Sequence, residues 1–257
     1  MPAEESTPAI VLRARDYAES DRIVTLLTRD AGKIGGIAKG AKASRYRFER
    51  KLEPFSHAVV HFRRRPHGQL VFITRAEAAD LHQHAIDGDL AKIALGIYML
   101  ELADALTAEE GEAAEAYRVL AAGLAALGAG HADMALRQAF EMRLLGWAGF
   151  GLEFARCRNC AAIRNGTPDP AWFIPARGGI VCGECRPIDG IGAIRLSARS
   201  AAALARLATI PLGDASGAEP ADADGAMALS RFIASTIDRR LRSIPFLDLV
   251  FSTSGQS

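Results

Sequence analysis

The sequence predicts an α+β protein in which a five-stranded barrel precedes an α-helical region with an embedded four-cysteine metal site. Three observations support this fold class. Short β-branched segments occupy the N-terminal part, apolar helical segments follow them, and all the cysteines fall in two Cys-x-x-Cys pairs. We therefore divide the chain into a barrel domain of residues 1–80 and a helical domain of residues 81–257, with a metal-binding insertion at residues 155–187.

Short strands separated by turn signals dominate the first domain. Residues 31–33 (Ala-Gly-Lys) form a tight-turn signal between two apolar runs, and Gly35 and Gly36 permit a bend in the segment that follows. Five strands within about seventy residues favour a small Greek-key barrel, of which the OB-fold is the five-stranded member. The predicted strands are residues 9–15, 21–28, 33–39, 55–62 and 69–75.

Segments with helical periodicity follow from about residue 80. The first of them is apolar on nearly every side, which is typical of a helix in the middle of a bundle. Ser197 is a good N-cap for a later helix that ends before Pro211, and residues 213–225 have the composition of a loop. The predicted helices are residues 90–106, 113–127, 133–147, 198–209 and 229–241.

The cysteine spacing predicts one structural zinc ion. Two residues between thiolates let a tight turn direct both sulfurs at one point, and two such turns close a tetrahedral site. A predicted hairpin of residues 171–174 and 179–181 brings the turns together. Because the protein fills all four positions, no position is open for a catalytic water. The predicted ligands of Zn²⁺ are Cys157, Cys160, Cys182 and Cys185.

Two other uses of these cysteines remain open. Two disulfides would require an oxidising compartment, which no feature of the sequence indicates. A thioredoxin-like redox pair would require one motif at a strand–helix junction rather than two matched motifs. The matched spacing therefore favours zinc.

The net charge of +1 hides a strong segregation of charge along the chain. Residues 33–65 contain ten basic residues against Glu49 and Glu53. Such a block favours polyanion binding over a merely solvated basic face. Tyr46 and Phe48 lie among these cations and are candidates to stack on bases, although packing explains Phe48 better. The candidate nucleic-acid-binding residues are Lys33, Lys39, Lys42, Arg45, Arg47, Arg63, Arg64 and Arg65.

Enzyme signatures are missing from the sequence, so we predict no catalytic residues and no enzymatic activity. The glycine-rich residues 35–42 fail as a phosphate loop because Ala41 follows Gly40 where a lysine is needed. No nucleophile-elbow, dinucleotide-binding or zinc-deaminase motif occurs. The longest apolar run, residues 93–100, is too short to span a membrane. With no secretory leader either, we expect a cytoplasmic protein.

Several segments, in order, resemble the bacterial DNA repair and recombination mediator RecO family. The resemblance covers roughly residues 8–245, and its most specific part is the zinc spacing. The remaining similar segments are residues 10–22 (IVLRARDYAESDR), 32–40 (GKIGGIAKG), 52–55 (LEPF), 140–149 (FEMRLLGWAG) and 178–185 (GGIVCGEC).

This resemblance implies a recombination mediator without catalytic residues. Members of the family bind single- and double-stranded DNA and anneal complementary strands. They also help a recombinase load onto strands coated by single-strand-binding protein. The implied partners are RecR and the acidic, apolar C-terminal tail of that coating protein, and the implied location is the nucleoid. On this basis the basic residues above become candidate DNA-binding residues.

The predicted helix of residues 133–147 is a candidate site for that tail. Arg137 and Arg143 flank an apolar stripe of Leu136, Phe140 and Leu144. An apolar groove rimmed by arginine suits a peptide that ends in acidic residues and a phenylalanine. The alternative is that the stripe is bundle core, as helical apolar stripes usually are.

Two other classes of function remain open. The chain is compatible with a zinc-containing RNA-binding or translation-associated module, because OB barrels and zinc sites also serve RNA. It is also compatible with a zinc-stabilised interaction scaffold whose basic block only aids solubility. Arg239, Arg240 and Arg242, expected at the end of the last helix, are secondary DNA candidates. A hydrolase is the least supported class.

Overall fold

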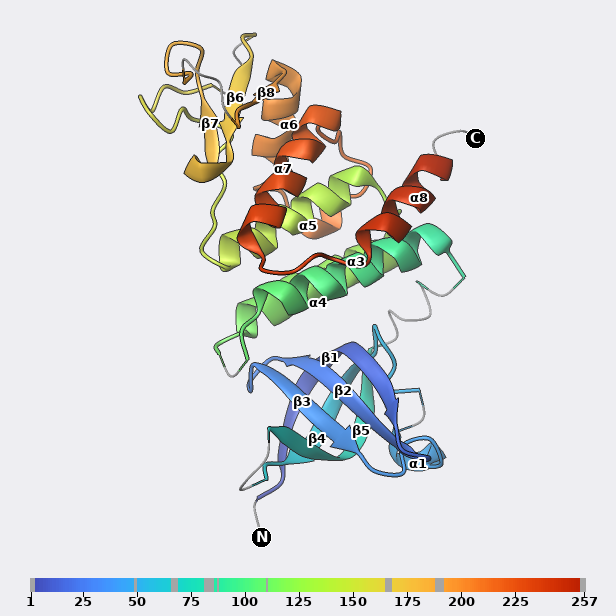
Figure 1. The fold of residues 1–257 in the computed structure, drawn as a ribbon. Coiled ribbons are helices and arrows are strands. Elements are labelled where there is room, and N and C mark those ends of the chain that lie inside the picture. Colours follow the sequence, from blue (N-terminus) through green and yellow to red (C-terminus); the bar gives the residue numbers. More distant parts are fainter. Residues whose placement is uncertain are drawn as a thin grey trace. The chain divides into compact units, whose positions relative to one another are not determined.

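The computed structural model divides the chain into two compact units. One comprises Met1–Ala129 with Leu241–Ser257, and the other comprises Gly130–Arg240 (Figure 1). The predicted domain boundary near residue 80 differs from this division and stays a prediction. The structure describes residues 3–48, 50–65, 69–80, 86, 88–109, 111–164, 168–187 and 192–254.

A closed five-stranded barrel forms the first part of the first unit, which confirms the predicted OB-fold architecture (Figure 1). Its strands follow the order β1-β2-β3-β5-β4, and only the β3–β5 pair is parallel. The strands are β1 (Glu5–Tyr17), β2 (Asp21–Thr28), β3 (Lys33–Ala38), β4 (His57–Arg63) and β5 (Leu70–Asp80).

Alternating burial explains why these segments close into a barrel. Every second residue of β4 is buried, and Val60 and Phe62 join Leu26 and Ile73 in the barrel core. Gly36 is required where β3 pairs with β5, because a Cβ at that position would lie 2.6 Å from the Ile73 side chain. Because successive side chains of a strand point to opposite faces, the alternating burial gives the barrel one apolar inner face.

The loop between β3 and β4 contains a short helix, α1 (Arg45–Phe48), that was not predicted. Phe48 and Leu52 are both buried in the barrel core cluster, so they attach this loop to the barrel. Tyr46, by contrast, is 94% exposed. The structure thus confirms packing for Phe48 and leaves Tyr46 open to solvent.

Helices α3 (Leu90–Leu106), α4 (Ala114–Ala129) and α8 (Ile244–Ser254) complete the first unit. The bounds of α3 are those predicted. Asp89 caps its first turn by accepting the amides of Ala91 and Lys92. Helix α8 was not predicted. Pro245 is its second residue, a position where proline is compatible with a helix start.

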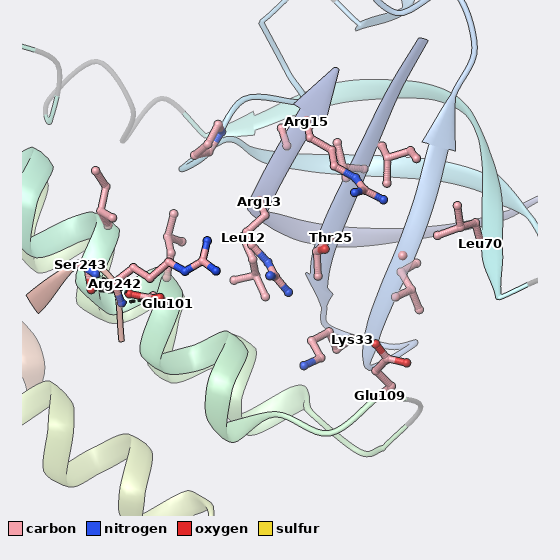
Figure 2. Close-up of a pocket in the computed structure, with 18 of the residues that line it drawn as sticks. Leu12, Arg13, Arg15, Thr25, Lys33, Leu70, Glu101, Glu109, Arg242 and Ser243 are labelled. Carbon is pink, nitrogen blue, oxygen red and sulfur yellow. Dashed lines mark hydrogen bonds between the residues drawn. The ribbon is translucent and has the colours of Figure 1, made fainter. Parts of the chain in front are cut away.

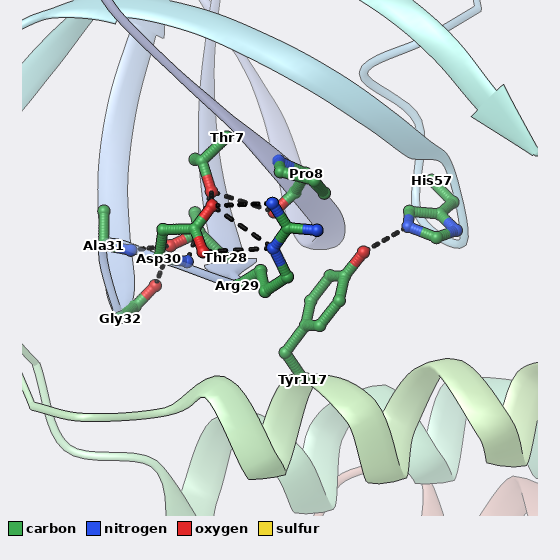
Figure 3. Close-up of polar contacts among 9 residues, drawn as sticks. All are labelled: Thr7, Pro8, Thr28, Arg29, Asp30, Ala31, Gly32, His57 and Tyr117. Atoms are coloured by element: carbon green, nitrogen blue, oxygen red, sulfur yellow. Dashed lines mark hydrogen bonds and ion pairs between the residues drawn. The ribbon is translucent and has the colours of Figure 1, made fainter.

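Helix α4 contacts the barrel through Tyr117, whose hydroxyl forms a hydrogen bond with Nε2 of His57 on β4 (Figure 3). Burial raises the pKa of Tyr117. At the nearby β2–β3 turn, Thr28 donates to the carbonyl oxygen of Gly32 at 2.7 Å. Gly32 has a φ of 71°, a conformation that favours glycine.

The second unit combines helices with a three-stranded sheet of order β7-β6-β8. Its β6–β7 hairpin has the predicted bounds, and Ser197 caps α6 as predicted by accepting the amide of Ser200. Strand β8 was not predicted. The elements are α5 (Met134–Trp147), β6 (Ala171–Ile174), η1 (Pro175–Arg177), β7 (Gly179–Val181), β8 (Ile194–Leu196), α6 (Ala198–Leu207), η2 (Leu212–Asp214) and α7 (Ala223–Thr236).

The last predicted helix is displaced. Helix α7 starts at Ala223, inside the segment expected to be a loop, and ends at Thr236 because Ile237 adopts an extended backbone. Arg239 and Arg240 therefore follow the helix instead of ending it, and Arg242 belongs to the other unit. Among the described residues, no helix combines the length and apolar character needed to cross a membrane.

Candidate metal centre and nucleic-acid interface

The four cysteines meet at one point in the second unit. Their Sγ atoms all lie within 4.8 Å of one another, and none of the cysteines forms a disulfide. Cys157 and Cys160 come from one turn, and Cys182 and Cys185 come from the turn after β7. The Sγ atoms of Cys160 and Cys182 are 3.8 Å apart. A tetrahedron with metal–sulfur bonds of ~2.3 Å has edges of about that length. The donor set therefore fits a tetrahedral metal ion.

Backbone amides in this site stabilise the negatively charged form of a cysteine side chain. The amides of Asn159 and Cys182 each donate to Sγ of Cys157 at 3.4 Å. Burial raises the pKa of the Cys157 thiol, but the backbone hydrogen bonds outweigh burial and lower that pKa to about 6. A hydrogen bond from Asn159 lowers the pKa of Cys185, yet contacts with the neighbouring thiols outweigh it and raise that pKa to about 11. Four thiols this close resist full ionisation unless a cation joins them.

The centre is packed on the side of Cys157 and Cys182, whereas Cys160 is exposed and Cys185 is half-buried. Cys157 and Cys182 belong to the same buried cluster as Ile174 and Val181, with Trp172 packed against it. The guanidinium of Arg186 lies 5.2 Å from the Trp172 ring. With four protein ligands and apolar packing, the arrangement suits a structural ion and offers no position for a reacting water.

The loop after β3 gathers basic side chains at one end of the barrel. Lys39, Lys42 and Arg47 are all exposed there. Nζ of Lys42 is 2.9 Å from the Asp16 carboxylate. Arg47 donates to the carbonyl oxygen of Lys39 at 3.2 Å, and its guanidinium lies 4.9 Å from the Phe48 ring centroid. The side chain of Arg45 lies outside the described residues.

Sequence reasoning missed two cations at this end of the barrel. Arg22 on β2 forms ion pairs with Glu53 and Asp16, and together with Arg50 and Lys42 it lines a cavity of about 350 Å³. The signal that points to Arg22 is its place in the similar segment of residues 10–22. We define the basic loop surface by Arg22, Lys39, Lys42, Arg47 and Arg50.

Lys33 lies apart from the basic loop surface, at the opposite end of β3. Its Nζ donates to the carbonyl oxygen of Asp104 at 2.9 Å and lies 3.4 Å from the carboxylate of that residue (Figure 2 shows Lys33). Arg13 contacts the same buried carboxylate at 2.9 Å. Lys33 therefore joins the barrel to α3, and its side chain is only 12% exposed.

The remaining basic candidates on the barrel lie at the end of β4 and directly after it. Arg63 is 3.6 Å from the Glu4 carboxylate, and Arg64 is 3.1 Å from that of Glu5. Arg65 is exposed. Exposed ion pairs of this kind contribute little stability, so phosphates can replace the carboxylates at small cost.

The two arginines of α5 have structural partners. Arg137 is buried and pairs with Glu141 at 2.9 Å, whereas Arg143 donates to the carbonyl oxygens of Thr209 and Ile210 at 2.8 and 2.6 Å. The intervening stripe, Leu136, Phe140 and Leu144, has no exposed surface. The stripe is core and not an open groove, and partner binding by the two arginines stays a prediction.

The fold and the site define a class of protein in which an OB-fold barrel is joined to a helical region with a four-cysteine centre. Two family models cover nearly the whole chain. The model described as "Recombination protein O N terminal" matches residues 1–82, and that described as "Recombination protein O C terminal" matches residues 87–247. The chain therefore belongs to the RecO family of DNA repair proteins, as the sequence resemblance predicted.

Curated relatives agree with this assignment over nearly their full length. The "DNA repair protein RecO" of Anaeromyxobacter sp. (strain Fw109-5) is 39% identical over 243 residues, which are 94% of each chain. The protein of the same name from Streptomyces griseus is 34% identical over 251 residues, 93% of this chain and 96% of the relative. That of Nocardioides sp. (strain ATCC BAA-499 / JS614) is 32% identical over 93% of this chain and 97% of the relative.

Proposed function

We propose that the protein is a non-enzymatic recombination mediator that binds single- and double-stranded DNA and anneals complementary strands. It helps a recombinase load onto strands coated by single-strand-binding protein, in the cytoplasm at the nucleoid. The observation that carries this proposal is the basic loop surface, where Lys39, Lys42 and Arg47 are exposed at one end of an OB barrel and Tyr46, their neighbour in sequence, is exposed as well. The names of the relatives, DNA repair proteins, support the same conclusion.

The basic loop surface binds the phosphate backbone without regard to sequence. Lys42 and Arg47 can exchange their exposed intramolecular partners for phosphates, and the counterions released from DNA favour this exchange. Lys39 is exposed on the same surface. Tyr46 offers an exposed ring on which one base stacks. Arg63, Arg64 and Arg65 extend the cationic surface. Lys33 supports the fold instead, because its contact with Asp104 joins the barrel to α3.

Zinc is the metal that this centre is proposed to hold. Cys157, Cys160, Cys182 and Cys185 ligate one Zn²⁺ as thiolates, because four sulfur donors in tetrahedral arrangement are the donor set that structural zinc prefers. The ion supplies cross-linking and no reaction step. It holds the two turns and the β6–β7 hairpin together, so its binding free energy adds to folding.

RecR and the C-terminal tail of single-strand-binding protein are the proposed protein partners, with Arg137 and Arg143 as proposed contacts for the tail. Arg143 is the better probe because Arg137 is buried beside Glu141. In Arg143→Gln the folded protein should bind a labelled tail peptide more weakly. Unchanged affinity for the tail peptide would show that the tail binds at a site without Arg143.

An annealing assay tests the proposed function directly. Complementary strands precoated with single-strand-binding protein should anneal faster when the protein is added, and a recombinase should then form filaments on coated single strands only when RecR is also present. RNA strands serve as the control. Equal salt-dependent binding to DNA and RNA, without annealing, would favour the RNA-binding alternative.

A further inference from the structure

The cavity that Arg22, Lys42 and Arg50 line differs from the surface around it, because its inner end is closed. Its volume is about 350 Å³, at the small end of the range of about 300–1,000 Å³ that is typical of small-molecule sites. Phe48 and Leu52 also line it, and both side chains belong to the buried barrel core. A chemical group can therefore enter from the solvent side, but a polynucleotide chain has no way through. We call this feature the loop cavity.

The charges that line the loop cavity are mostly positive. Among its described lining residues, Arg22, Lys42 and Arg50 carry three positive charges against the single carboxylate of Glu53. Asp16 pairs with Lys42 and Arg22 but is not one of those lining residues, and its side chain is 55% exposed. Exposed ion pairs of this kind contribute little, so Lys42 can exchange Asp16 for another anion at small cost. The lining therefore favours an anion with more than one negative charge.

Ser44 adds a neutral hydrogen-bond donor to the lining of the loop cavity. Its Oγ accepts hydrogen bonds from the backbone amide and from Nε of Arg47, at 3.3 and 3.2 Å. Within the described part of the chain the hydroxyl proton of Ser44 has no acceptor, so it is available to a bound oxygen atom. Cations together with a hydroxyl donor form a group of side chains that suits phosphate oxygens.

The walls of the loop cavity are held in place without a ligand. Arg22 is only 22% exposed and is fixed by its ion pair with Glu53. The backbone amide of Lys42 donates to the carbonyl oxygen of Ser20 at 3.0 Å, which attaches the loop to the turn between β1 and β2. Arg50 has a φ of 50°, a conformation that is uncommon for any residue other than glycine and that recurs at ligand sites. Pre-organisation of this kind lowers the entropic cost of binding.

A terminal phosphate of a nucleic-acid strand matches the loop cavity better than an internal phosphate does. An internal phosphodiester carries one negative charge and continues into the chain on both sides, so it suits an open surface. A phosphomonoester continues on one side only, carries between about 1.5 and 2 negative charges at neutral pH and presents three acceptor oxygens. It therefore fits both the closed inner end and the excess of two positive charges in the lining.

We propose that the loop cavity binds the terminal phosphate of a nucleic-acid strand. Arg22, Lys42 and Arg50 pair with its oxygens and Ser44 donates a hydrogen bond, while the rest of the strand follows the basic loop surface. This inference rests on the proposed DNA-binding function and narrows it, because the surface that neutralises the backbone also recognises where a strand ends.

Fluorescence anisotropy with the full-length protein tests this inference. The probes are single strands of one sequence with an internal fluorescein and with a 5′-phosphate, a 3′-phosphate or hydroxyls at both ends. A phosphate at the recognised end should raise the affinity about tenfold over the hydroxyl-ended strand, and the end that produces the gain is the end that the cavity binds. Arg50→Gln and Lys42→Gln should each remove most of this gain, because each takes one cation from the cavity.

Lys39→Gln is the matched control. It removes an exposed cation from the basic loop surface but not from the described lining of the loop cavity. It should weaken the binding of all three strands by the same factor and leave the gain from the terminal phosphate unchanged. Circular-dichroism melting checks that each variant is folded.

The outcomes separate this inference from the proposed function. Equal affinity of the phosphate- and hydroxyl-ended strands for the wild-type protein would overturn the inference and leave the DNA surface intact. A gain that persists in both Arg50→Gln and Lys42→Gln would do the same. Failure of all three strands to bind would overturn the proposed DNA-binding function and this inference with it.

Deoxyadenosine 5′-monophosphate distinguishes a strand end from a free nucleotide, which carries the same phosphomonoester. Because it lacks further backbone, it should bind much more weakly than the phosphorylated strand. In excess it should lower the affinity of that strand to the level of the hydroxyl-ended one. Binding of the mononucleotide as tightly as the phosphorylated strand would overturn the assignment to a strand end.

Discussion

The barrel and the small β7-β6-β8 sheet achieve stability by different means. The barrel closes five strands around fully buried side chains such as Leu26, Val60 and Phe62. The small sheet has strands of only three or four residues, and the buried cluster beside it includes Cys157 and Cys182. A closed barrel supplies its own core, whereas a sheet this short buries little by itself, and we expect it to depend on the proposed metal cross-link.

The largest expected effect follows from removing that cross-link. Cys160→Ser should lose stoichiometric zinc and unfold residues 155–187 locally, because structural zinc sites contribute roughly 10–16 kcal/mol of apparent binding free energy. Hydrogen exchange should show reduced protection at β6 and β7 and unchanged protection in β1–β5. Metal analysis gives the stoichiometry.

Chelation provides the control for this variant. A strong chelator should reproduce the Cys160→Ser exchange pattern in the wild-type protein and add nothing in the variant. Full metal content in Cys160→Ser, or wild-type protection of the hairpin, would refute a structural role for the ion.

The second prediction distinguishes the role of Lys33, at the start of β3, from that of Lys39, just after its end. Lys33→Met should lower the free energy of unfolding by about 1–3 kcal/mol, because it removes a cationic partner from the buried Asp104. Its effect on DNA affinity should be small, in contrast to Lys39→Met, which should weaken DNA binding without changing stability. Urea unfolding and fluorescence anisotropy with labelled DNA measure both quantities. The reverse pattern would make Lys33 a DNA ligand.

The third prediction concerns the basic loop surface as a whole. Combined replacement of Lys39, Lys42, Arg45 and Arg47 by alanine should weaken binding to strands of any sequence. For every phosphate that is no longer neutralised, the slope of log affinity against log salt concentration should fall by about 0.7 to 0.9. A salt titration measures the slope, and Arg231→Ala is the matched single control. A wild-type slope in the quadruple variant would show that DNA binds a different surface of the protein.

The smallest expected effect concerns the cap of α7. Asp222 accepts the amide of Gly225 at 3.1 Å and a hydrogen bond from the Ser197 hydroxyl at 2.9 Å. Burial raises the pKa of Asp222, but these hydrogen bonds outweigh it and lower the pKa below its usual range. Asp222→Ala should therefore cost about 1 kcal/mol at neutral pH.

The pH dependence of this cap has a definite sign. Because the folded-state pKa is depressed, the stabilisation is present above the unfolded value of about 3.9 and is lost as the pH falls through the folded value. Wild type and Asp222→Ala should thus converge in stability in strong acid, as measured by urea unfolding at several pH values. A constant difference down to the lowest pH would show that the carboxylate charge is unimportant.

Local signals in the sequence determined much of the fold. The spacing of Cys157, Cys160, Cys182 and Cys185 predicted a set of ligands that do converge. Ser197 marked a helix start because a cap acts on amides two or three residues away. The five strands were predicted from short β-branched and apolar runs and from turn residues, although β5 extends five residues beyond its predicted end. Such features depend on neighbouring residues, which a single sequence displays.

Long-range pairing was decided only by the tertiary structure. Lys33 and Asp104 are separated by 71 residues, so no local pattern shows that this lysine joins the barrel to α3. The same holds for Arg143, whose partners lie on another segment, and for Glu101, which accepts the amide of Arg242, 141 residues away, just before α8. A basic or acidic side chain has the same local signature whether it faces solvent or a buried partner. Its role is set by which surfaces chain closure brings together, and that depends on packing across the whole unit.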